Sequence, residues 1–186
     1  IRNQYIVSSA HNVVKPKNQE RYVPIMGSIY KTVRGAYTAE DIDYQTNNSN
    51  QCSMNASLKK DKKSNFSFSK RVVNMDYKST ILQTSIIDSW ELIKGNGVEI
   101  NWYFGKNYIP KISSIKDNII ELKFDQKNEM AMKIKSKEKI TANLFDYNFS
   151  GTYGLLEKCK GIKIQSDNKI GDLQTHLLVD LNKNIR

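Results

Sequence analysis

The sequence predicts a mainly β protein, an antiparallel β-sandwich with two short helices near the C-terminal half and one disulfide. Short segments alternate apolar and polar side chains, which is the period of a strand with one buried face. Short polar turns separate these segments at even spacing, and this favours a sandwich or a partly closed barrel over parallel β–α–β units. Two widely separated cysteines, Cys52 and Cys159, suggest the disulfide.

Length and composition fit one domain with an irregular extension. The chain has 186 residues, of which 39% are apolar and 10% aromatic, enough for a single core. A polar run from Thr46 to Asn50 separates two regions of different pattern. We therefore expect an extended, irregular arm over residues 1–47 and the sandwich domain over residues 48–186.

The predicted arm lacks a clear hydrophobic period. Two prolines and many charges suit an extended linker over residues 13–24. Residues 25–37 are compatible with either a loose amphipathic helix or paired extended segments, and Thr38 is a plausible cap of a brief helical turn. An irregular segment rich in apolar and aromatic residues can gain order by lying on a partner. The residues expected to do so, unless they pack on their own domain, are Tyr22, Val23, Ile25, Met26, Ile29, Tyr30 and Tyr37.

Strands are predicted throughout the domain. The clearest spans residues 98–104, where Val98, Ile100 and Trp102 share one face, and it follows the strong turn signal Gly95-Asn96-Gly97. The other predicted strands cover residues 52–58, 65–70, 77–87, 111–115, 119–124, 140–144, 147–149, 162–165 and 176–181.

Two segments are interpreted as helices. Residues 125–137 alternate as a strand would, but they contain good helix formers, and Met130 and Ile134 are one helical turn apart, so a short helix is favoured over a strand. Residues 152–160 are expected to form the second helix, with Leu155, Leu156 and Cys159 turned toward the core. Gly161 would then cap its C-terminal end.

The two cysteines cannot make a structural zinc site, which needs four ligands with close paired spacing. A Cys52–Cys159 disulfide would close a long loop, worth about 4 to 5 kcal/mol in the chain-entropy model, and would imply an oxidising compartment. The alternative is a pair of unrelated buried thiols in a cytosolic protein. No stretch approaches the ~20 apolar residues of a membrane helix, and a start at Ile1 rather than methionine suggests that a leading segment has been removed.

The formal charge of +10 favours anionic partners, among them nucleic acid, phospholipid and cell-wall polymer. The alternative is that the lysines only keep the surface solvated. Aromatic side chains near lysines could bind single-stranded nucleic acid on an OB-like barrel: Tyr103 and Tyr108 near Lys106, or Phe66 and Phe68 near Lys63 and Lys70. Against this, the phenylalanines alternate with serines as a core face would.

No pattern indicates catalysis. The two histidines, His11 and His176, lie in the arm and in a leucine-rich segment, so neither is expected beside a cysteine. Phosphate-binding, zinc-protease and EF-hand motifs are absent, and Glu40, Asp41 and Asp43 are neighbours in the arm rather than a pair across a cleft. We therefore expect no enzyme, no cofactor and no metal.

The stretch NFSGTYGLLEKC, residues 148–159, resembles a motif of small exported bacterial proteins of the invasion-associated locus B type. In that family a strand ends before a glycine, here Gly151, and a helix then carries inward residues and a cysteine. Cys52 resembles the partner cysteine of the family. The resemblance covers residues 52–159 and implies a β-rich, disulfide-linked, periplasmic or secreted protein without assigned chemistry.

The sequence therefore predicts a non-enzymatic, exported protein–protein interaction module. Such a module could be an accessory subunit of a bacterial envelope or secretion assembly, or a secreted virulence-associated factor. The alternative is a basic OB-like barrel that binds nucleic acid or another anionic polymer.

Overall fold

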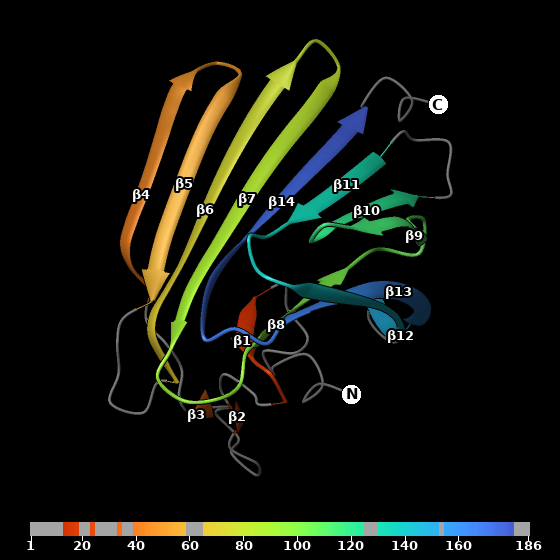
Figure 1. The fold of residues 1–186 in the computed structure, drawn as a ribbon. Helices are drawn as coiled ribbons and strands as arrows, with labels where there is room; N and C mark the ends of the chain where they lie inside the picture. The colour runs from red at the N-terminus through yellow and green to blue at the C-terminus, as the bar shows by residue number, and fades with distance from the viewer. Residues whose placement is uncertain are drawn as a thin grey trace.

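The structure is a computed structural model that describes residues 13–18, 23–24, 33–34, 39–58, 65–124, 130–152 and 155–180. Within these ranges the chain forms strands and turns, with no helix. Two antiparallel sheets face each other (Figure 1), as expected for a β-sandwich. No helix of the described part is long and apolar enough to cross a membrane.

The larger sheet has eight strands in the order β4-β5-β6-β7-β14-β11-β10-β9. Hairpins join consecutive strands on both sides of β14, which pairs with β7 over its whole length and with β11 on its other side. The strand bounds are β4 (Ala39–Asn48), β5 (Gln51–Leu58), β6 (Phe66–Lys78), β7 (Ile81–Leu92), β9 (Pro110–Lys116), β10 (Ile119–Phe124), β11 (Met130–Lys135) and β14 (Ile170–Asp180).

The smaller sheet has the order β1-β8-β13-β12. Its strands are β1 (Val14–Pro16), β8 (Val98–Tyr103), β12 (Ile140–Thr152) and β13 (Leu155–Ser166). A separate pair joins β2 (Val23–Pro24) to β3 (Val33–Arg34). Because β1 and β4 precede residue 48 and pair with β8 and β5, both sheets include residues of the predicted arm, and the boundary at residue 48 stays a prediction.

The core lies between the facing sides of the two sheets. On β8 the predicted alternation is correct: Val98, Ile100 and Trp102 are buried in the hydrophobic core. Core residues from the larger sheet include Trp90, Ile120, Ile134 and Leu173. Burying each of these side chains contributes roughly 1.5 to 3 kcal/mol, so the facing surfaces of the sheets hold the sandwich together.

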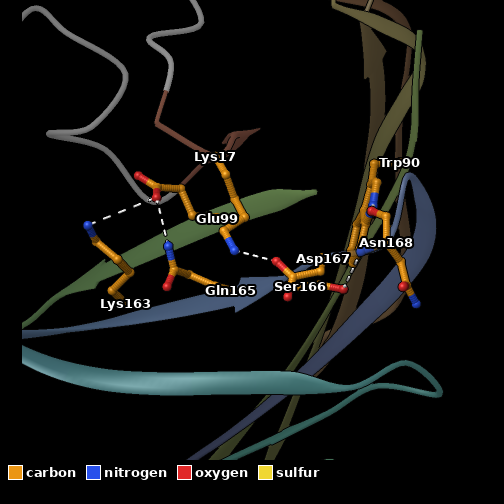
Figure 2. A network of polar contacts seen from close by, with 8 residues as sticks. All are labelled: Lys17, Trp90, Glu99, Lys163, Gln165, Ser166, Asp167 and Asn168. Carbon is orange, nitrogen blue, oxygen red and sulfur yellow. Dashed lines mark hydrogen bonds and ion pairs between the residues drawn. The ribbon is translucent and has the colours of Figure 1, made fainter. Parts of the chain in front are cut away.

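The outer side of β8 is also buried, around an ion pair. The Lys15 ammonium of β1 lies 2.6 Å from a Glu99 carboxylate oxygen, and both side chains are more than nine-tenths buried. Gln165 donates to the other carboxylate oxygen at 3.2 Å, and the Lys163 ammonium lies 4.0 Å from it (Figure 2). The contacts among Lys15, Glu99 and Gln165 join β1, β8 and β13.

The loop after β13 is tied to both sheets in the same region. Lys17 pairs with Asp167, and the Trp90 indole N–H donates to the Asn168 carbonyl at 3.2 Å (Figure 2). Gly97 approaches this loop so closely that a Cβ would lie 2.0 Å from the Ser166 carbonyl oxygen, and its φ of +97° favours glycine.

The smaller sheet covers only part of the larger one. In Figure 1, β4, β5 and the upper ends of β6 and β7 extend past it. On the side that faces the core elsewhere, Tyr44 is 63% exposed and Met54 is 47% exposed, and Met75 and Tyr77 continue the row. These four residues form what we call the uncovered apolar face.

Both predicted helices are wrong. Residues 130–135 form β11, in which Met132 and Ile134 are buried while Lys133 and Lys135 are exposed, because β10 and β14 pair with it from both sides. Residues 155–166 form β13, which pairs with β12 along its length. Tertiary pairing therefore outweighs the helix propensity of both segments. The helical turn expected after Thr38 is also replaced by a strand, β4.

The Cys52–Cys159 disulfide is wrong as well, because both thiols are free. Cys159 stands on a strand and alternates with the core residue Ile162, so it faces the outer side of the smaller sheet. Cys52 pairs with Met75 and faces the inner side of the larger sheet. The two thiols thus lie on different sheets, and Cys159 points away from the sheet that carries Cys52.

The arm residues expected to bind a partner fall almost entirely outside the described residues. Val23 belongs to β2, but its side chain is not described. The others are Tyr22, Ile25, Met26, Ile29, Tyr30 and Tyr37, and their role stays a prediction.

Candidate functional site

A basic hollow opens where β8 separates from β13. β13 pairs with β8 only from Gly161 to Ser166. Residues 155–160 of β13 continue beyond the end of β8 and pair only with β12. After Tyr103 the chain turns away through residues 104–109, and the Tyr108 N–H bonds to the Gly105 carbonyl at 2.8 Å. The β12–β13 hairpin and this turn form the two walls of the hollow.

The hollow has a volume of about 510 Å³, within the range of small-ligand sites. Its lining is basic and aromatic, with one buried thiol. It comprises Lys106, Lys158, Lys160, Tyr108, Tyr147, Cys159, Asp146, Asn148, Gly105 and Ile109. We call it the basic hollow.

Backbone and side-chain bonds hold the two walls together. The Tyr147 hydroxyl on β12 donates to the Phe104 carbonyl at 2.7 Å, and the Phe104 N–H donates to the Lys160 carbonyl at 3.3 Å. Tyr103 packs edge-on against Phe145 and Tyr147, with ring centroids 5.4 and 4.9 Å away. The position of the hollow is therefore fixed by strand pairing and ring packing, not by a loop alone.

The lysines of the hollow are partly neutralised. Lys106 lies 2.5 Å from a Glu157 oxygen, and Lys160 lies 2.7 Å from an Asp146 oxygen. The hydrogen bond from Lys106 to Glu157 raises the pKa of that ammonium, so it stays charged at neutral pH. Strand alternation places Lys158, Lys160 and Asp146 on one side of the β12–β13 hairpin and Glu157, with its partner Lys106, on the other. The excess of positive charge therefore lies near Lys158.

The Cys159 thiol, on the side of β13 opposite to Lys158 and Lys160, is not poised to react. Cys159 is 4% exposed, and burial raises the pKa of its thiol, which keeps it in the unreactive protonated form at neutral pH. His176 lies on the other sheet and faces the outer side, opposite to the direction of Cys52. Among the described residues, no group of three or more His, Cys, Asp or Glu side chains could hold a metal ion.

Sequence reasoning identified part of this site. It grouped Tyr108 with Lys106, and both line the hollow, whereas Tyr103 belongs to the ring cluster outside it. It missed Lys158 and Lys160, because residues 152–160 were expected to be helical. The signal was the alternation Lys158-Cys159-Lys160, which places both lysines on one side of a strand.

The second predicted aromatic group does not form a site. The alternation with serine predicted both phenylalanines on one core face. Phe66 is buried in the core, but Phe68 is exposed, because a β-bulge between them breaks the alternation. Lys63 lies outside the described residues.

Comparisons with known proteins identify the fold. No family model and no curated protein matches the chain. Solved structures do match: the heparan sulfate lyase HepC from Pedobacter heparinus has a TM-score of 0.69 at 14% identity, over 98% of this chain and 26% of that chain. A heparinase III, the BT4657 gene product, has a TM-score of 0.64 at 15% identity, over 95% of this chain and 24% of that one.

The fold is shared with heparan sulfate lyases. The chain spans about a quarter of the length of these proteins. At identities of this size the likeness carries the fold and assigns no catalytic residue.

This likeness corrects one expectation. The prediction that the protein is not an enzyme is contradicted, because solved structures that match 93% to 99% of this chain are a heparan sulfate lyase and heparinase III proteins, over about a quarter of their own length. The comparisons do not bear on the resemblance to the invasion-associated locus B type, which stays a prediction. Its implied helix is, however, a strand in this chain.

Proposed function

We propose that this chain is the β-sandwich portion of a polysaccharide lyase, and that its basic hollow binds acidic groups of the polysaccharide. The observation that carries the proposal is the fold shared with heparan sulfate lyases over almost the whole chain. Heparan sulfate bears sulfate and carboxylate groups, and a net charge of +10 favours such a polymer.

The geometry of the hollow supports this ligand class. Ammonium groups form strong charge-assisted hydrogen bonds with anionic oxygens, and three lysines line the open volume, of which Lys158 and Lys160 stand on the same side of the hairpin. Tyr108 adds an apolar ring surface and a hydroxyl, a combination suited to sugar rings. A bound anion would compete with Glu157 and Asp146 for the lysines, so binding should weaken as salt increases.

The test is binding of a heparan sulfate oligosaccharide, measured by calorimetry at low and at physiological salt. The variant Lys106→Ala/Lys158→Ala/Lys160→Ala should lose about tenfold in affinity, or roughly 1.4 kcal/mol. Lys94→Ala removes an exposed lysine that does not line the hollow and should leave affinity unchanged. Thermal unfolding checks that both variants fold.

The proposal would be contradicted if the triple lysine variant bound the oligosaccharide as tightly as the original chain. A duplex DNA of similar charge is the comparison ligand. Equal affinity for DNA and for the oligosaccharide, with equal loss in the triple variant, would mean that the hollow recognises charge alone.

A second candidate function is protein–protein interaction, which the uncovered apolar face favours. Exposed apolar rows such as Tyr44, Met54, Met75 and Tyr77 mark interaction sites in soluble proteins. In this second candidate function the protein is still proposed to be an exported module, periplasmic or secreted. The expected disulfide, which was one reason for that location, is not formed. Met54→Glu should abolish a complex recovered with the chain from its native source, while oligosaccharide binding persists.

A further inference from the structure

A second hollowed surface lies on the outer side of the larger sheet, away from the smaller sheet and from the basic hollow. It is a groove of about 580 Å³ across β5, β6, β7 and β14. One cross-strand row runs along it, in which Ser53 pairs with Asn74, Asn74 with Ser85, and Ser85 with His176. The next row adds Gln51, Asp76 and Gln83.

The alternation of side chains along each strand explains why many polar side chains stand on this surface. The residues between those of the row, such as Met75 on β6 and Leu177 on β14, point to the inner side, where Leu177 packs against the core. Most outer side chains of these rows are amides and hydroxyls, which can both donate and accept hydrogen bonds, and Leu178, paired with Gln83, adds an exposed apolar side chain. Asp76 is bonded to Lys78 at 2.9 Å, so the groove carries little net charge.

The row continues into a basic region on β11. His176 pairs with Lys133, and Lys135 stands two residues further on the same side. The Lys133 ammonium bonds to Glu121 at 2.9 Å, and Lys135 is exposed. Neighbouring strands are about 4.8 Å apart, so the four steps from Ser53 to Lys133 span roughly 19 Å, the length of several sugar rings.

We infer that this groove is a second saccharide site, in which an acidic oligosaccharide lies across the strands from β5 to β11. Its hydroxyls bond to Asn74, Gln83 and Ser85, and a sulfate or carboxylate group binds Lys133 and Lys135. The ligand class rests on the proposed function, whereas the position of the site, on the other sheet, does not. The groove is called the outer groove below.

His176 joins the two parts of the outer groove. Burial lowers the pKa of its imidazole, and the ammonium groups of Lys135 and Lys133 lower it further, so the ring is neutral at neutral pH. The paired residue on β7 is Ser85, which carries no charge. A neutral ring can share a hydrogen bond with a sugar hydroxyl, and an anion on the two lysines would raise the pKa of the ring.

The test uses a heparan sulfate oligosaccharide and a neutral glucose oligosaccharide of similar length, with nuclear magnetic resonance of the intact chain. The heparan sulfate probe should shift the amide signals of Asn74, Gln83 and Ser85 and raise the pKa of His176. Lys133→Ala/Lys135→Ala should remove these shifts, and Asn74→Ala/Gln83→Ala should weaken binding several-fold. Lys94→Ala is the matched control.

The proposals for the basic hollow and for the outer groove can be contradicted independently of each other. If the Lys106→Ala/Lys158→Ala/Lys160→Ala variant still shows the shifts in the outer groove, the second site is supported. If that variant abolishes all binding and the groove signals never move, the inference is overturned while the proposed function stands. Equal shifts with the neutral probe, insensitive to Lys133→Ala/Lys135→Ala, would also overturn it.

Discussion

Cys159 illustrates how strand geometry decides the chemistry of a single residue. A helix would have turned its thiol toward the core and toward a partner cysteine, whereas the strand places it on the outer side against Tyr147. Burial then raises its pKa. Cys52 is partly exposed at the inner side of the larger sheet, whereas Cys159 stands on the smaller sheet.

The two thiols should therefore react at different rates. In the folded chain a thiol reagent should label Cys52 first, and Cys159 should react only at the rate at which the structure opens, because thiolate is the reactive form. Mass spectrometry of the labelled chain measures this. Cys52→Ser should leave only the slow phase. An intact mass that increases on reduction would instead show a disulfide and contradict the structure.

Sequence patterns predicted strands best where a period of two was the only signal. Residues 98–104 were predicted from their alternation, and β8 confirms them. Residues 155–160 and 130–135 carry the same alternation, but their good helix formers and the spacing of Met130 and Ile134 favoured helices. The outcome is decided by pairing with other strands, β12 for one segment and β10 and β14 for the other, which the period of a single segment does not reveal.

Pairing between strands also explains why the sequence did not reveal some residues of the basic hollow and the whole of the outer groove. Tyr108 and Lys106 are close in sequence, so they could be grouped, whereas Lys158 and Lys160 join them only because β13 runs beside the end of β8. The outer groove is assembled from four strands, and no short stretch of sequence contains its row.

At the level of elements, the attachment of β1 depends on a buried charge pair. Glu99→Gln should destabilise the chain by about 3 kcal/mol, because it leaves the Lys15 ammonium buried without its counter-charge. Denaturant unfolding measures the change. Glu91→Gln removes an exposed carboxylate near the C-terminal end of β7 and should change stability by less than about 0.5 kcal/mol. A Glu99→Gln variant as stable as the original would mean that the pair is not buried.

On the scale of the whole molecule, the two sheets are unequal, and stability should follow that inequality. The strands β7 and β14 are paired on both sides and contribute Trp90 and Leu173 to the core. The edge strand β4 is paired only with β5, and Ile42 and Tyr44 are among its exposed side chains. Regions with few buried apolar contacts open at a lower free energy than the global unfolding.

Hydrogen exchange should therefore be fastest in β4, intermediate in β5 and slowest in β7 and β14. The opposite edge strand, β9, is the internal comparison, because Pro110 is buried there and Ile112 packs against the core. Exchange of β9 should be slower than that of β4 although both are edge strands. Protection of β4 equal to that of β7, at every protein concentration, would mean that the inner side of β4 is covered within the chain. If that protection is lost on dilution, a second copy of the chain covers the uncovered apolar face.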